Sequence, residues 1–197
     1  MTKYVLNSGG IRNQPKLKKD FHQEMVKDLG QDVKILMVLF PVAREYWEQK
    51  YPLSCASIQS DLKGYNLKLE MAFPDRFESQ VKAADVIYMA GGDDALCRYW
   101  FSSYDLPDLF KNKVVATNSA TSEMLAVNYW TCDWRKCDDG FGILPIKFLP
   151  HYKSEFGTDD PRGPINWEQA KRELEEYGDK RLPLYALKEG EYEVFEV

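Results

Sequence analysis

The chain has 197 residues, of which 44% are hydrophobic and 29% are charged, and its formal net charge is -5. A chain of this length can bury one sizeable core, so we expect a single domain over residues 1–197. The acidic balance argues against a nucleic-acid-binding surface. No apolar run reaches the roughly 20 residues that span a bilayer, and the first residues read directly as a core strand. We therefore expect a cytoplasmic protein without membrane partners.

Strand and helix patterns alternate along most of the chain. In chain order, the expected strands cover 3–7, 33–40, 67–72, 86–89, 113–116, 184–187 and 191–196. The expected helices cover about 15–29, 43–63, 77–84, 94–101, 119–127 and 167–177. The part after residue 130 is less regular. Alternating strands and helices predict an α/β fold with a mostly parallel sheet that is covered by helices on both faces.

Three expected strand ends carry residues that suit a binding site, namely Ser8-Gly9-Gly10, Gly91-Gly92-Asp93 and Asn118-Ser119. Sites in parallel sheets form beyond the carboxyl ends of the strands. The stretch 153–166 is rich in Gly, Pro and Asp, which predicts a mobile loop. The four cysteines form no C-x-x-C pair, and only two histidines accompany them, so no metal site is expected.

An apolar strand, a sharp turn bearing Ser119 and a helix are the context of a nucleophile elbow. A serine before a helix is also a common helix cap, so this pattern leaves both roles open. At another strand end, two glycines let the backbone approach a substrate closely. The Gly92 amide could then form an oxyanion hole with the amide of Ala120. A tight turn with Asp93 as the helix cap is compatible with the same residues.

A general base must come from His22 or His151, the two histidines of the chain. His22 lies in an expected helix among acidic and amide neighbours, and we expect it to be solvated. His151 follows an expected strand and Pro150, which fixes the backbone and makes His151 the candidate base. Glu189 matters only if it orients His151, which is the role of the third member of a catalytic triad.

These pieces, in this order, resemble the dipeptidase E (aspartyl dipeptidase) and cyanophycinase family of serine peptidases over nearly the whole chain. Ala90-Gly91-Gly92-Asp93 is similar to the glycine-rich turn of the family, and Asn118-Ser119-Ala120 falls where the family has G-x-S-A-G. The stretch from Gly140 to His151 resembles the family segment G-x-G-L-L-P leading into P-H-F, and Leu187-Lys188-Glu189-Gly190 looks like the late E-G element. The order Ser, His, Glu and the spacing between these residues also fit.

The resemblance implies a three-layer sandwich of the flavodoxin-like or class I glutamine-amidotransferase-like kind. It implies that Ser119 attacks an amide carbonyl, with His151 as base and Glu189 as its orienting acid. It also assigns the oxyanion hole to the amides of Gly92 and Ala120. The substrate would be a small peptide or isopeptide, next to an aspartate in known members. No metal or organic cofactor is implied, and we expect a monomer or homodimer.

The chain departs from the family at the elbow, where Thr117 and Thr121 replace two glycines. Threonine is β-branched and disfavours positive φ, so a relaxed turn would displace Ser119. The alternative function is therefore a catalytically degenerate relative that binds a peptide or protein partner. An inward-pointing carboxylate from Asp93-Asp94 would also oppose an oxyanion hole.

The substrate class is less constrained by the sequence. An esterase or amidase that acts on a non-peptide substrate could use the same triad. Recognition of an acidic side chain would require a basic residue. By position in the sequence, the candidates are Arg98, Arg135, Lys153 and Arg162, although we expect each of them to be a surface residue.

Overall fold

A computed structural model describes all residues from 1 to 197 and contains two β-sheets. The larger sheet has six strands in the order β10-β1-β5-β4-β2-β3. These strands are β1 (Lys3–Asn7), β2 (Asp32–Val38), β3 (Asn66–Met71), β4 (Val86–Met89), β5 (Val114–Asn118) and β10 (Tyr192–Glu196). All neighbours pair in parallel except β10, which pairs antiparallel with β1. The predicted α/β class with a mostly parallel sheet is confirmed.

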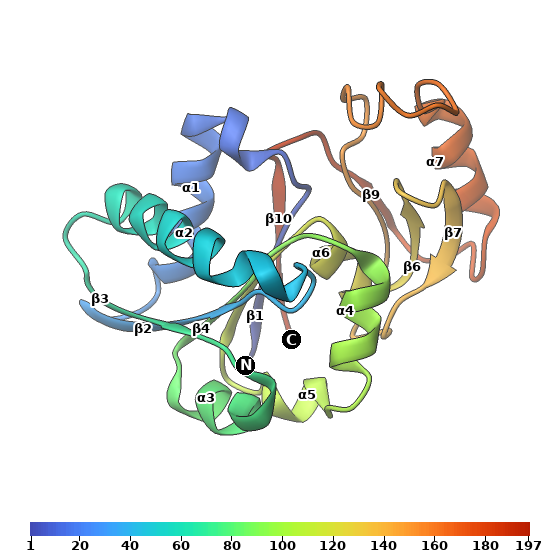
Figure 1. The fold of residues 1–197 in the computed structure, drawn as a ribbon. Coiled ribbons are helices and arrows are strands. Elements are labelled where there is room, and N and C mark those ends of the chain that lie inside the picture. Colours follow the sequence, from blue (N-terminus) through green and yellow to red (C-terminus); the bar gives the residue numbers. More distant parts are fainter.

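Helices cover both faces of the large sheet, as Figure 1 shows. One face carries α1 (Pro15–Val26) and α2 (Trp47–Asp61), and the other carries α3 (Phe77–Ala83) and α5 (Leu106–Leu109). The central strands β4 and β5 are almost wholly buried, as expected for parallel strands covered on both faces. Short 3-10 turns η1 (Ile11–Asn13), η2 (Arg44–Tyr46) and η3 (Pro74–Arg76) precede α1, α2 and α3.

The second sheet was not predicted from the sequence. It contains β6 (Ala126–Thr131), β7 (Lys136–Asp139), β8 (Leu144–Leu149) and β9 (Leu184–Ala186) in the order β7-β6-β8-β9. The helix expected at 119–127 is shorter, because α6 (Ala120–Leu125) gives way to β6, whose aromatic and β-branched residues favour a strand. The outer side of this sheet is covered by α7 (Trp167–Glu176).

The hydrophobic core runs through both sheets. Its largest cluster joins residues of the six-stranded sheet to Tyr129, Leu144, Ile146 and Phe148 of the second sheet. Between the sheets lie α6 and α4 (Asp94–Phe101), which contact each other. No helix of the structure has the length and apolar character needed to cross a lipid bilayer.

Candidate active site

The carboxyl ends of β1, β5 and β4 meet at one edge of the large sheet, because these three strands are parallel neighbours. Asn7 of β1 lies opposite Asn118 of β5, and Met89 of β4 lies opposite Thr117. A cavity of about 850 Å³ opens there, and its lining includes residues from all three strand ends. The three strand ends that the sequence singled out are therefore brought together.

Ser119 occupies a sharp turn between β5 and α6. Its backbone angles are φ 51° and ψ -115°, a conformation that non-glycine residues rarely adopt. Its amide donates to the carbonyl of Asn7 over 3.0 Å, and its carbonyl accepts the amides of Ser122 and Glu123 from the first turn of α6. These bonds hold the backbone in the strained geometry of a nucleophile elbow.

The two threonines of the elbow are fully buried and take part in its hydrogen bonds. The Thr121 hydroxyl accepts the Asn118 amide over 2.9 Å and lies 3.0 Å from the carbonyl of Met89 on the neighbouring strand. The Thr117 and Ser122 hydroxyls lie 2.8 Å apart. The turn is thus not relaxed by the loss of glycine, because hydroxyl groups bind its backbone to β4 and α6.

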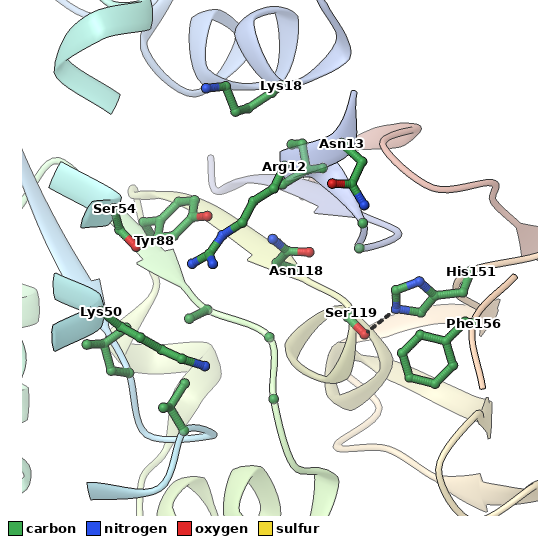
Figure 2. Close-up of a pocket in the computed structure, with 18 of the residues that line it drawn as sticks. Arg12, Asn13, Lys18, Lys50, Ser54, Tyr88, Asn118, Ser119, His151 and Phe156 are labelled. Carbon is green, nitrogen blue, oxygen red and sulfur yellow. Dashed lines mark hydrogen bonds between the residues drawn. The ribbon is translucent and has the colours of Figure 1, made fainter. Parts of the chain in front are cut away.

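Ser119, His151 and Glu189 form one chain of side-chain contacts. Ser119 Oγ lies 3.0 Å from Nε2 of His151 (Figure 2), and Nδ1 of His151 lies 3.1 Å from Oε1 of Glu189. The serine end faces the cavity, whereas the histidine side chain is only 7% exposed. This is the geometry in which a hydroxyl, a base and an orienting acid act in sequence.

Two glycines let the backbone pass directly behind this chain of contacts. A Cβ atom on Gly9 would lie 2.3 Å from the His151 ring, and one on Gly10 would lie 2.3 Å from the Glu189 carboxyl carbon. Both glycines also have positive φ. The glycine pair after β1 is therefore required by the close approach of backbone to His151 and Glu189.

Ser8 links the two segments that carry the base and the acid. Its hydroxyl accepts the His151 amide over 2.7 Å and donates to the Leu187 carbonyl over 2.8 Å. Nearby, the Asn7 side chain donates to the Gly190 carbonyl over 3.1 Å. The end of β1 thus positions both His151 and the turn around Glu189.

Phe156 covers the outer face of the His151 ring, with the two ring centroids 4.3 Å apart in a stacked arrangement. It belongs to the loop 153–166, which contains no regular helix or strand. Arg135 holds this loop by donating to the carbonyls of Gly157 and Gly163. Burial lowers the pKa of His151 below its ordinary value, and the Glu189 carboxylate offsets part of that effect. A neutral imidazole is the form that can accept a proton from Ser119.

Ala120 follows Ser119 directly, and Gly91 is the glycine of the turn after β4 that approaches Ser119, since a Cβ atom there would lie 3.2 Å from the Ser119 Cβ. Ala120 is the first residue of α6, so its amide has no partner within the helix. Gly92 lines the cavity, and a Cβ there would lie 2.2 Å from the Pro41 carbonyl oxygen. Asp93 does not point at this position, because its carboxylate caps α4 by accepting the Leu96 amide over 2.8 Å. Asp94, in contrast, lines the cavity.

The basic residues of the cavity are not those expected from the sequence. Arg12 points into the cavity beside Tyr88 and Asn118, and Lys50 points into it from α2 (Figure 2). No carboxylate pairs with either of them. Lys18 also lines it, but it is paired with Asp61. The four predicted candidates lie outside the lining: Arg98 donates to Asp139, Arg135 holds the loop, Lys153 pairs with Glu168 and Arg162 pairs with Asp160.

Arg12 was within reach of sequence reasoning, because it follows the glycine pair that ends β1. Lys50 had no local signal, since it lies on α2 and reaches the cavity only through the packing of that helix. The expectation for His22 was wrong. His22 is only 3% exposed, and its Nδ1 lies 2.8 Å from Asp61. It is buried because the helix that carries it, α1, packs against α2 and the large sheet.

Two solved structures match nearly the whole chain. One is a peptidase from an acI-B1 Actinobacterium, with 19% identity and a TM-score of 0.66 over 99% of this chain and 83% of that one. The other, described as a candidate peptidase E from Listeria monocytogenes EGD-e, has 12% identity and a TM-score of 0.66 over 100% of this chain and 99% of that one. The chain has the peptidase E-like fold. No family model and no curated protein sequence matches it.

Proposed function

We propose that the chain is a serine peptidase of the dipeptidase E and cyanophycinase kind, which cleaves a small peptide or isopeptide through an acyl-enzyme. The observation that carries the proposal is the contact chain from Ser119 through His151 to Glu189, on an elbow in the strained backbone conformation. The two peptidases of the same fold support it.

In the proposed mechanism, Ser119 Oγ attacks the carbonyl carbon of the scissile amide while His151 Nε2 takes the hydroxyl proton. Glu189 accepts a hydrogen bond from Nδ1–H and stabilises the imidazolium that forms. The amides of Gly92 and Ala120 stabilise the oxyanion of the tetrahedral intermediate. The imidazolium then donates its proton to the leaving amine. A water molecule, deprotonated by the same histidine, finally hydrolyses the acyl-enzyme and restores the serine.

The proposed substrate carries an acidic group near the scissile bond. Arg12 and Lys50 support this, because they are the basic side chains that point into the cavity without an acidic partner. Such cations bind carboxylates through charge-assisted hydrogen bonds. A dipeptide with an N-terminal aspartate fits this description.

The test is intact-mass analysis after exposure to a fluorophosphonate, which reacts with activated serine hydroxyls. We expect one adduct on the wild type and none on Ser119→Ala. Ser103→Ala is the matched control, since Ser103 is exposed and distant from the cavity, and it should label like the wild type.

If the wild type is labelled, unlabelled wild-type protein would then be assayed with a panel of Asp-X dipeptides against a panel of esters, which separates a peptidase from an esterase. Absence of labelling on folded wild-type protein would sink the hydrolase proposal. It would favour the degenerate relative that binds a peptide or protein partner.

A further inference from the structure

Two buried carboxyl groups face each other in the wall of the cavity. Asp94 is the first residue of α4, and Glu123 lies in α6, one turn after the nucleophile elbow. The residues are 8% and 2% exposed, yet both line the cavity. The side chains are close enough to share a proton, and the Thr131 hydroxyl lies beside Asp94. Neither residue is required by the mechanism described above.

The pair has no cationic partner within the protein. Asp94 Oδ2 is buried and receives no hydrogen bond. Arg98, on the same helix, donates instead to the Asp139 carbonyl and lies 3.9 Å from Asp138. Burial raises the pKa of Glu123 well above its ordinary value, and burial also raises the pKa of Asp94. Buried carboxylates are costly unless a cation or a donor compensates them.

The pair also lies close to the reacting atoms. The Glu123 amide donates to the Ser119 carbonyl over 3.0 Å, so the two residues are about one helical turn apart, about 6 Å along the axis. Side chains on a helix lean toward its N-terminus, which directs Glu123 back toward the Ser119 end of α6. A group bound by the pair would therefore belong to the part of the substrate next to the scissile carbonyl.

We propose that Asp94 and Glu123 form a subsite for a primary ammonium group on the acyl part of the substrate. An ammonium group has three donors and one positive charge, which suit two carboxyl groups and the Thr131 hydroxyl. This inference rests on the proposed peptidase function. With Arg12 and Lys50 in the part of the same cavity that α1 and α2 border, the substrate would be dipolar, with its cation and its anion in separate parts of one cavity.

The ammonium can come from the N-terminal amine of the cleaved residue or from a short basic side chain. Binding to Ser119→Ala protein, measured by titration calorimetry, separates the two sources without turnover. The three probes are Asp-Ala, N-acetyl-Asp-Ala and N-acetyl-Lys-Ala. We expect the Ser119→Ala protein to bind at least one probe with a free ammonium about 10- to 100-fold more tightly than N-acetyl-Asp-Ala, the range of a charge-assisted hydrogen bond. Preference for Asp-Ala identifies the α-amine, and preference for N-acetyl-Lys-Ala identifies a side-chain amine.

The substitutions Asp94→Asn and Glu123→Gln, each added to Ser119→Ala, should reduce this preference to less than about threefold, since they remove the charge but keep the shape. Asp93→Asn is the matched control, because Asp93 caps α4 outside the cavity and asparagine also caps helices. Its preference should remain that of the parent. Circular dichroism checks that each variant is folded. Because the two substitutions are made separately, the test can still be read if one of the two variants does not fold.

Equal affinity for all three probes, no binding of any probe at millimolar concentration, or a preference that survives both substitutions would overturn the inference. Fluorophosphonate labelling of wild-type protein is read separately. Labelling without ammonium preference leaves the peptidase proposal intact and removes the subsite. Ammonium preference without labelling supports the subsite and removes the peptidase.

Discussion

His151 is held between a carboxylate and an aromatic ring. Glu189 contacts Nδ1, and Phe156 stacks on the ring face, so most of the imidazole is withdrawn from water. Burial favours the neutral imidazole and the carboxylate favours the charged one, and the pKa of His151 is lowered because burial has the larger effect. The residue is therefore kept in the form that accepts a proton, at pH values where a free histidine would be partly charged.

The lowered pKa of His151 predicts how the reactivity of Ser119 depends on pH. Ser119 is activated only while His151 is neutral, so the rate of fluorophosphonate labelling should fall on acidification with a midpoint below 6.5, the ordinary histidine value. Phe156→Ala would expose the ring to water, raise its pKa and move the midpoint upward. Phe156→Leu, which keeps an apolar cover, should stay close to the wild type. A wild-type midpoint above 6.5, or no shift in Phe156→Ala, would contradict this account.

At the scale of single residues, the site was partly predictable from the sequence. Ser119 lies in a strand–turn–helix pattern, and His151 was one of two histidines, so each had a local or compositional signal. The role of Arg12 and Lys50 depends instead on how η1 and α2 pack over the strand ends. The same is true of the carboxyl pair, since Asp94 and Glu123 come from different helices that touch only in the folded chain.

Among the elements, β5 and α6 carry Ser119 at their junction, and this junction depends on buried hydroxyl groups. The Thr121 hydroxyl compensates the backbone amide of Asn118 and contacts the Met89 carbonyl of β4. A glycine elbow achieves the turn through backbone freedom, whereas this one achieves it through hydrogen bonds. The departure from the family pattern is thus compensated locally.

Thr121→Val tests this compensation, because it keeps the shape of the side chain and removes its hydroxyl. Leaving buried backbone groups unpaired should lower the free energy of unfolding by about 1–3 kcal/mol. A displacement of Ser119 of about 1 Å would slow labelling on the order of 100-fold. Thr121→Ser keeps the hydroxyl, so it should retain most of the wild-type stability and most of the wild-type labelling rate. Urea unfolding and labelling rates measure the two effects, and wild-type labelling by Thr121→Val would refute the role of the hydroxyl.

The elements were predicted unevenly along the chain. The strands up to β5 and the helices α1 to α4 were located from the sequence, because buried parallel strands are continuous apolar runs bounded by turn residues. The short helix α5 was not predicted. The strands β6 and β7 were not separated from the irregular segments around them, whereas β8 is the strand expected, without bounds, before Pro150 and His151. β7, with the sequence Lys-Cys-Asp-Asp, has no apolar alternation and is a strand only because β6 lies beside it.

On the scale of the whole molecule, the two sheets share their interior. Phe148 and Tyr129 of the second sheet belong to the same buried cluster as the strands of the first, while a smaller cluster under α7 includes Trp130 and Leu174. A shared core couples the stability of its parts. We therefore propose that residues 1–197 unfold as one unit.

The measurement is urea unfolding followed by far-ultraviolet circular dichroism and by tryptophan fluorescence. Because the core is continuous, the two transitions should coincide within error. The chain has five tryptophans. Trp47→Phe removes a buried reporter on α2 and Trp130→Phe removes one in the second sheet, so the difference between each variant and the wild type gives the signal from one half. Two transitions with different midpoints would show instead that each sheet unfolds independently.

Glu189 lies near the end of the chain, so it is synthesised after Ser119 and His151. The nucleophile precedes its base, and the orienting acid follows both, held by contacts of Gly190 with Gly9 and Asn7 near the N-terminus. Ribosomes add roughly 5–20 residues per second, so Ser119 is synthesised several seconds before Glu189. During that interval a nascent chain carries Ser119 without Glu189, so the proposed triad is incomplete until the last strand closes against the first.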